Sequence, residues 1–192
     1  MLRRLYDWTF SLAAHPNALW ALALVAFAES SVFPIPPDIL MIPMIIAAPH
    51  RAFRIALVCL VASVLGALLG YLIGAQLFET VGRPVIEFYG KADAADAFRA
   101  SFNEWGVWAV LIAGITPFPF KVITIMSGGT GLSLPVFVAS AIVARGIRFY
   151  LVAILLWKFG APIRDFIERR LGLLTILFFL VLGGGFYAVK FL

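Results

Sequence analysis

The chain has 192 residues, of which 63% are hydrophobic and only 13% are charged. A soluble domain is about 45–50% apolar and about 25% charged, so this composition excludes an ordinary soluble protein. The net charge of +5 does not indicate nucleic-acid binding, because the cations are scattered around apolar segments, where membrane orientation and anionic lipid headgroups explain them. We expect a single membrane domain over residues 1–192.

Three long uncharged segments shape this expectation. They cover residues 8–28, 55–78 and 171–189. A helix that spans a bilayer needs about 20 apolar residues, and each segment is near that length. The segments predict an all-α, polytopic integral membrane protein with a C-terminal transmembrane helix over residues 171–190. Whether residues 8–32 form a full span or part of a hairpin stays open, as does the side on which the termini lie.

A proline-rich motif interrupts the apolar sequence at residues 34–39, which read PIPPDI. Proline cannot continue a helix, so Pro34 and Pro36 break the chain there. About 11 apolar residues flank the motif on each side, and a helix of that length covers roughly 16 Å, half of the hydrocarbon core. Unwound backbone at this depth is tolerated only inside protein or beside a wet cavity. We predict a re-entrant helical hairpin with its tip near the midplane; a kinked span is the alternative.

The same pattern returns 83 positions later in the chain. Residues 117–122 read PFPFKV, so Pro117 and Pro119 repeat the order P-x-P-x-charge-aliphatic, and a long apolar segment follows again. We interpret this order as an internal repeat, with repeat 1 over about 17–78 and repeat 2 over about 105–161. Each repeat would contain one re-entrant hairpin and one transmembrane helix.

Such a repeat crosses the membrane an odd number of times, so the second copy must be inverted relative to the first. The hairpins then enter from opposite faces and their tips meet near the midplane, as in secondary transporters. The connector between the repeats, residues 79–104, is predicted to be interfacial and to form a short helix on the membrane surface, or else a solvated connector. With this topology the face of the N-terminus carries more cations, which favours it as the cytoplasmic face.

Small residues also recur at regular spacing in the segment 55–78. Gly66, Gly70 and Gly74 are four residues apart and therefore share one helix face. Small residues let helix backbones approach closely within membranes. We expect this face to pack a hairpin against its partner span.

Five ionisable residues lie inside the predicted membrane region. Ionisable groups at this depth are costly, so each one is a functional candidate. Glu29 precedes the first tip, Asp38 lies in that tip, and Lys121 lies in the second tip. Arg145 and Arg148 are three residues apart, so both guanidinium groups can face one cavity.

These residue types predict two roles. Arginine offers a planar fork of donors for phosphate and lysine adds a point charge, so Lys121, Arg145 and Arg148 are predicted to bind a lipid phosphate. Carboxyl groups inside a helix bundle can exchange protons near neutral pH, so Glu29 and Asp38 are predicted to couple transport to protons. The alternative is that the five charges form salt bridges that only hold the tips together.

No pattern in the sequence indicates an enzyme, a metal site or a cofactor. The single cysteine, Cys59, cannot form an intrachain disulfide. The glycine-rich stretch SGGTG at residues 127–131 lacks the lysine and the strand–helix context of a phosphate-binding loop. We therefore expect neither catalysis nor a bound metal or cofactor.

Three stretches together resemble a known family. They are FAESSVFPIPPD, GITPFPFKVITIMSGGTG and ARGIRF, and the resemblance covers about residues 26–149. They resemble the DedA family, also called VTT or SNARE-associated membrane proteins, and within it the bacterial YqaA-like branch. The resemblance implies two opposed re-entrant hairpins and proton-coupled flipping or scrambling of lipids, including polyprenyl-phosphate carriers. In these terms Glu29 and Asp38 match the family's paired acids, and Lys121 and Arg145 occupy basic positions like those of its second motif.

One departure leaves the lipid substrate open. Many DedA proteins carry R-x-x-P-x-x-R at the second tip, whereas Gly114 and Phe120 take those places around Pro117 here. The headgroup could belong to a phospholipid or to a polyprenyl phosphate. We expect a proton-linked lipid translocase, a flippase or scramblase, that is multi-pass in the bacterial cytoplasmic (inner) membrane. A proton-coupled transporter of a small ion or drug cation and a non-catalytic membrane scaffold are the alternatives, and homo-oligomerisation stays open.

Overall fold

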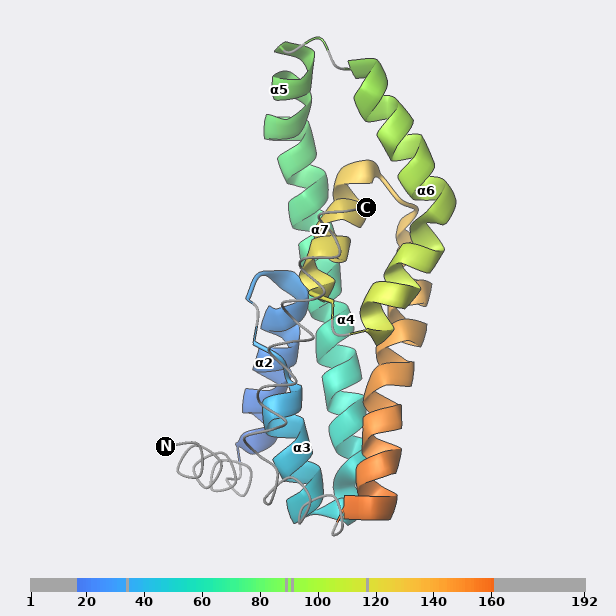
Figure 1. The fold of residues 1–192 in the computed structure, drawn as a ribbon. Coiled ribbons are helices and arrows are strands. Elements are labelled where there is room, and N and C mark those ends of the chain that lie inside the picture. Colours follow the sequence, from blue (N-terminus) through green and yellow to red (C-terminus); the bar gives the residue numbers. More distant parts are fainter. Residues whose placement is uncertain (1–16, 34, 89, 91, 117, 161–192) are drawn as a thin grey trace, which may run out of the picture.

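The computed structural model describes residues 17–160 except positions 34, 89, 91 and 117, and every regular element in this part is a helix (Figure 1). The all-α expectation is therefore confirmed for the described residues. The predicted C-terminal transmembrane helix over 171–190 and the first part of the segment 8–28 lie outside them. In chain order the elements are α2 (Ala18–Ser31), α3 (Asp38–Ala47), η1 (Pro49–Arg51), α4 (Ala52–Leu77), η2 (Phe78–Gly82), α5 (Arg83–Phe88), α6 (Ala92–Ile115), α7 (Phe120–Thr130) and a final helix, Leu134–Gly160.

The first two helices form a hairpin around the first proline motif. Helix α2 ends at Ser31, and the chain stays non-helical through Pro36 until α3 begins at Asp38. Pro36 therefore lies in the predicted break, whereas Pro34 lies outside the described residues. The carboxylate of Asp38 stands in the first turn of α3, where the helix dipole favours a negative charge.

The second proline motif also lies between two helices. Helix α6 ends at Ile115, Pro119 has an extended backbone with ψ of 99°, and α7 begins at the next residue. Pro117 lies outside the described residues. Helix α7 ends at Thr130, and the next residue, Gly131, has a φ of +72°, the left-handed conformation that glycine adopts without strain.

The helices around the predicted connector are longer than the sequence suggested. The elements from η1 to α5 form one helix of 40 residues, Pro49–Phe88, so residues 79–88 continue α4. Residues 92–104 form the first half of α6. This part of α6 contains neither glycine nor proline and is rich in alanine, the best helix former, so nothing interrupts the helix at the predicted boundary.

A π-helical turn, η2, marks the point where the long helix departs from regular geometry. Pro84 lies two residues after η2 and has no N–H to donate to the preceding turn. Turns with wider hydrogen bonding of this kind accommodate such a defect within a continuous helix. The ion pair between Arg83 and Glu79, with an N–O distance of 3.1 Å, adds local support across it.

Helix α4 is the axis around which the other helices pack (Figure 1). Helices α2 and α3 lie beside its first half, and α6 and α7 lie beside its second half, so the two hairpins point in opposite directions. Both turns lie near the middle of α4, and the helix Leu134–Gly160 runs along the other side. The result places the two proline-containing turns next to each other.

The predicted face of small residues on α4 is confirmed and serves both hairpins. A side chain at Gly66 would collide with the backbone of Phe27 in α2, and one at Gly74 would collide with the backbone of Ile125 in α7. Gly70 lies between them, against the side chain of Thr124 and the backbone of Ser30. The close approach of both hairpins to α4 therefore depends on the absence of side chains along this face.

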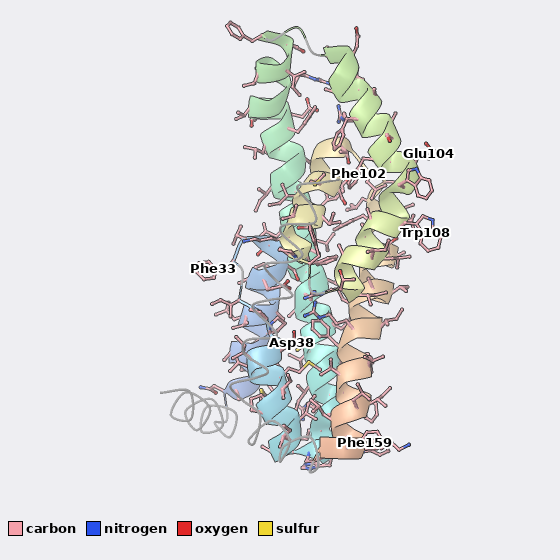
Figure 2. All side chains as sticks on the ribbon, viewed as in Figure 1. Phe33, Asp38, Phe102, Glu104, Trp108 and Phe159 are labelled. Atoms are coloured by element: carbon pink, nitrogen blue, oxygen red, sulfur yellow. The ribbon has the colours of Figure 1, made fainter. Side chains whose placement is uncertain are left out.

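Two helices, Pro49–Phe88 and Leu134–Gly160, are long and apolar enough to cross a membrane by length and composition. Large apolar side chains cover much of the outer surface, and Phe33 and Trp108 point away from the helices (Figure 2). A surface of this kind needs a hydrophobic environment, because monomeric soluble proteins rarely expose contiguous apolar patches above a few hundred Å².

Candidate functional site

The five predicted ionisable residues gather where the two hairpin turns meet, and we refer to them as the tip cluster. Glu29 comes from the end of α2 and Asp38 from the start of α3. Lys121 comes from the first turn of α7, and Arg145 and Arg148 come from the middle of the final helix. Figure 2 shows Asp38 near the height at which the hairpins meet. Residues more than 80 positions apart in the sequence thus lie side by side.

The first ion pair of the cluster joins Arg145 to Glu29, with 2.5 Å between Nη2 and Oε2. The Arg145 side chain is completely buried, and its guanidinium group lies over the rings of Phe120 and Phe149, 4.9 and 4.7 Å from their centroids. Contacts between a cation and the face of an aromatic ring are favourable when the cation has lost its water. This pair therefore sits in a closed apolar site that joins α2 to the final helix.

A serine of α4 completes the surroundings of this pair. Arg145 donates from Nε to Ser63 Oγ over 2.7 Å, and the hydroxyls of Ser63 and Ser30 lie 2.7 Å apart. Ser30 in turn donates to Glu29 Oε2 over 3.1 Å. The sequence analysis missed Ser63, although a polar residue three positions before Gly66 on the small face of α4 was the available signal. Buried networks of this kind are stable only when their members find partners.

The second ion pair joins Arg148 to Asp38, with 2.7 Å between Nη2 and Oδ2. Arg148 also donates from Nη1 to the carbonyl oxygen of Thr116 over 2.9 Å. Arg148 therefore contacts the start of α3, through Asp38, and the residue that follows α6, Thr116, at the same time. The side chains of Arg148 and Asp38 are 18% and 22% exposed, which distinguishes this pair from the buried one.

The second pair is partly exposed because it lines a cavity of about 320 Å³. Asp38 and Arg148 are the two charged residues in its lining, and the remaining walls are apolar: Ile42, Ile115, Ile147, Leu151 and Val152. The volume lies near the lower end of the range for small-molecule sites, about 300–1,000 Å³. An apolar cavity with one carboxylate and one guanidinium group suits a molecule with both an apolar and a charged part.

Lys121 is the one base of the cluster that makes no ion pair with a carboxylate among the described residues. Its Nζ donates to the carbonyl oxygen of Val32 over 3.2 Å, and Thr124 Oγ1 donates to the carbonyl oxygen of Ser30 over 3.1 Å. These two bonds connect the second hairpin directly to the first. Lys121 also stands in the first turn of α7, where the helix dipole adds to its attraction for an anion.

The structure thus brings the five residues together without giving the three bases a common open pocket. Four charges form two neutral pairs, and Lys121 remains as the spare cation. Arg145 Nη1 is buried and has no protein partner in the part of the chain that is described. The arrangement of the two arginines matches the alternative in which salt bridges hold the tips together, because each one is engaged by a carboxylate.

Within the described ranges, no group of three or more His, Cys, Asp or Glu residues could hold a metal ion. Cys59 is a buried free cysteine in the apolar core between α3 and α4. Cys59 is therefore part of the packing of these helices.

Comparison with known proteins identifies the family. A model of the VTT domain matches residues 35–158, a range that contains four of the five residues of the tip cluster. The chain is 39% identical over 168 residues to a protein of Haemophilus influenzae named "Uncharacterized protein", covering 85% of this chain and 87% of the relative. It is 36% identical over 185 residues to "Uncharacterized protein HI0703 homolog" of Histophilus somni, covering 93% and 96%.

No solved structure matches the chain. The family match covers more than half of the 192 residues, and it agrees with the resemblance carried by the two proline motifs. The described helices supply two elements with the length and apolarity of membrane spans. The chain belongs to the VTT-domain, or DedA, family of membrane proteins.

Proposed function

We propose that the protein is a proton-linked lipid translocase, a flippase or scramblase, which moves a phosphate-bearing lipid across the bacterial cytoplasmic membrane. The observation that carries the proposal is the Asp38–Arg148 pair, which lines an otherwise apolar cavity at the meeting point of two broken helices. A lipid combines an anionic group with apolar chains, and this cavity offers a partner for each.

The proposed membrane arrangement is a multi-pass inverted repeat with two re-entrant hairpins. Support comes from the opposite directions of the hairpins beside α4 and from the contact between their turns (Figure 1). The charges at the two ends of the described helices also differ. Arg51, Arg54 and Lys158 lie at one end, and Arg83 and Arg99 lie at the other, so the first end, which has more cations among the described residues, is assigned to the cytoplasm.

Competition for Arg148 is the central step of the proposed mechanism. A proton taken up by the Asp38 carboxylate makes it a neutral acid, which leaves the guanidinium group of Arg148 without its counter-ion. An unpaired donor in this partly exposed position costs about 1–2 kcal/mol, so an incoming anion that restores the pairing is favoured. A lipid phosphate presents oxygens that fit the planar fork of arginine. Loss of the proton restores the original pair and releases the lipid.

Lys121 and Arg145 take different parts in this scheme. Lys121 has no carboxylate partner among the described residues and stands at the start of a helix, so it attracts the phosphate at the tips without breaking an existing pair. Arg145 is completely buried by Phe120, Phe149 and Ser63 and positions the tips. Glu29 has the corresponding positioning role in α2, and proton exchange is assigned to Asp38, the acid that lines the cavity.

The cation-transporter alternative gains no support from this geometry, since both acids are already neutralised by arginine. The scaffold alternative is favoured by one observation: the charged residues tie the elements together. The two ion pairs join the first hairpin to the final helix, and Lys121 joins the second hairpin to the first. The two remaining functions differ in a measurable way, because a scaffold does not accelerate lipid flipping.

The test is lipid flipping by the full-length chain reconstituted into liposomes. Fluorescent phosphatidylglycerol, phosphatidylethanolamine, phosphatidylcholine and a polyprenyl phosphate are compared, each at several pH values. We expect acceleration for at least one phosphate-bearing lipid, and its dependence on pH to disappear in Asp38→Asn. Flipping no faster than in empty liposomes for all four lipids would reject the translocase and leave the scaffold.

A further inference from the structure

A second cavity, of about 470 Å³, lies away from the tip cluster between α4, η2, α5, α6 and α7, in the upper half of Figure 1. Its lining is almost entirely apolar and includes Leu77, Phe78, Val81, Phe98, Ile125 and Met126. Arg99 of α6 is the one charged residue among the lining residues. The volume lies within the range of small-molecule sites, about 300–1,000 Å³. An ion surrounded by apolar walls is costly unless a partner of opposite charge is present.

Arg99 is held in a fixed position by neutral groups. Its Nε donates to the carbonyl oxygen of Thr130 over 3.3 Å, and its guanidinium carbon lies 4.2 Å from the centroid of the Phe78 ring. Asn103 donates to the same carbonyl oxygen over 3.1 Å and so fixes the acceptor. Arginine has five N–H donors, and no carboxylate engages the other four among the described residues. The guanidinium group is therefore oriented, and the described part of the chain gives it no anionic partner.

The cavity lies at the base of the second hairpin rather than at its tip. Thr130 ends α7 and Lys121 stands near its beginning, so nine residues of helix, roughly 14 Å, separate them. The walls belong to the outer half of the second hairpin, at the end of the molecule that also carries Asp93 and Asp96. In the proposed membrane arrangement, this position corresponds to the headgroup level of one leaflet.

We propose that this cavity binds one anionic lipid of that leaflet, with its phosphate on Arg99 and an acyl chain against the apolar walls. Charge complementarity identifies the occupant, because the uncharged stretch 171–189 of the chain offers no anion to Arg99. Free phosphate would leave the apolar walls unoccupied. The site does not depend on the proposed transport, and its occupant need not be the transported lipid.

The test is lipid binding to the full-length chain in detergent, measured by native mass spectrometry during titration with phosphatidylglycerol or phosphatidylcholine. The wild-type chain is expected to retain one phosphatidylglycerol in preference to phosphatidylcholine. Loss of a charge-assisted contact in Arg99→Gln should weaken retention of phosphatidylglycerol roughly tenfold or more. Ala95 lines the cavity from α6, so Ala95→Trp should fill it and abolish retention of both lipids.

Two matched variants separate this site from general effects. Arg83→Gln removes a cation beside the cavity that does not line it and is more than half exposed, and Ala97→Trp adds the same large side chain at an exposed position of α6. Both should bind phosphatidylglycerol as the wild type does. Equal weakening in Arg83→Gln and Arg99→Gln, or unchanged retention in Ala95→Trp, would overturn the site, as would displacement of the lipid by inorganic phosphate.

A further variant keeps this proposal distinct from the translocase. Lys121→Gln leaves the Arg99 cavity intact, so the retained phosphatidylglycerol should be unaffected even if flipping falls. Retention that disappears in this variant would show that the bound lipid lies at the tips and would overturn the second site. The unfolding temperature of each variant is measured in parallel, so that loss of binding is assigned only to folded protein.

Discussion

The two ion pairs of the tip cluster have the same chemistry and opposite surroundings. Glu29 and Arg145 are enclosed by aromatic rings and serine hydroxyls, and the arginine is completely buried. Asp38 and Arg148 line a cavity and are each about one-fifth exposed. The first pair is costly to separate because the guanidinium group of Arg145 would stay completely buried without its counter-ion. A pair that lines a cavity can exchange one partner for another anion, so the proposed function assigns a structural role to the first pair and a transport role to the second.

The largest effect is expected from Glu29→Gln, which removes the carboxylate from the first ion pair. The change leaves the positive charge of Arg145 in its closed site without a carboxylate, and loss of one partner of a buried pair costs about 3–5 kcal/mol. We expect a large fall in the free energy of unfolding and loss of flipping together, measured by chemical unfolding in detergent. A stable Glu29→Gln protein that still flips lipid would contradict the structural role of this pair.

The serine that supports the buried pair should have the next largest effect on stability. Ser63→Ala removes the acceptor of Arg145 Nε and the partner of the Ser30 hydroxyl, and unpaired buried donors cost about 1–3 kcal/mol. The control is Ser140→Ala, whose hydroxyl donates only to a carbonyl one turn earlier in its own helix. Similar losses of unfolding free energy in the two variants would show that the network around Glu29 stabilises the protein no more than an ordinary hydrogen bond within a helix does.

The exposed pair is expected to separate activity from stability. In Arg148→Gln the carboxylate of Asp38 remains in the first turn of α3, where the helix dipole stabilises it, so we expect a loss of only about 1–2 kcal/mol. Flipping of phosphate-bearing lipids should fall at least tenfold in liposomes. Flipping that is unchanged in a folded Arg148→Gln protein would remove this arginine from the proposed mechanism.

Lys121 differs from both arginines because it has no carboxylate partner among the described residues. Its replacement should therefore change stability the least. Lys121→Gln removes one hydrogen bond to a backbone carbonyl, so we expect a change in stability below about 1.5 kcal/mol. The flipping rate should fall for phosphatidylglycerol more than for the zwitterionic phosphatidylcholine, whereas Lys121→Arg should largely restore it. Equal effects on both lipids would mean that the lysine does not select the anionic headgroup.

Local chemistry made several parts of the fold predictable. Helix breaking by Pro36 and Pro119 follows from the missing N–H of proline, and the small face of Gly66, Gly70 and Gly74 follows from helix periodicity. The end of the long helix was not predictable in the same way. The acidic, alanine-rich residues 89–105 fit a surface helix and a solvated connector equally well by their sequence. The structure has Ala92–Ile115 as one helix, α6, and residues 79–88 as part of the Pro49–Phe88 helix.

The sequence by itself predicted a helical membrane protein with two broken segments, and with two acids and three bases within its apolar segments. These properties depend on composition and on spacing within a few turns of helix. Only the tertiary structure decided that Arg145 pairs with Glu29 and that Arg148 pairs with Asp38, whereas Lys121 meets no carboxylate within residues 17–160 as described. The physical reason is distance along the chain: each pair joins residues more than 100 positions apart, so the packing of both hairpins against α4 sets which charges meet and which of them an outside molecule can reach.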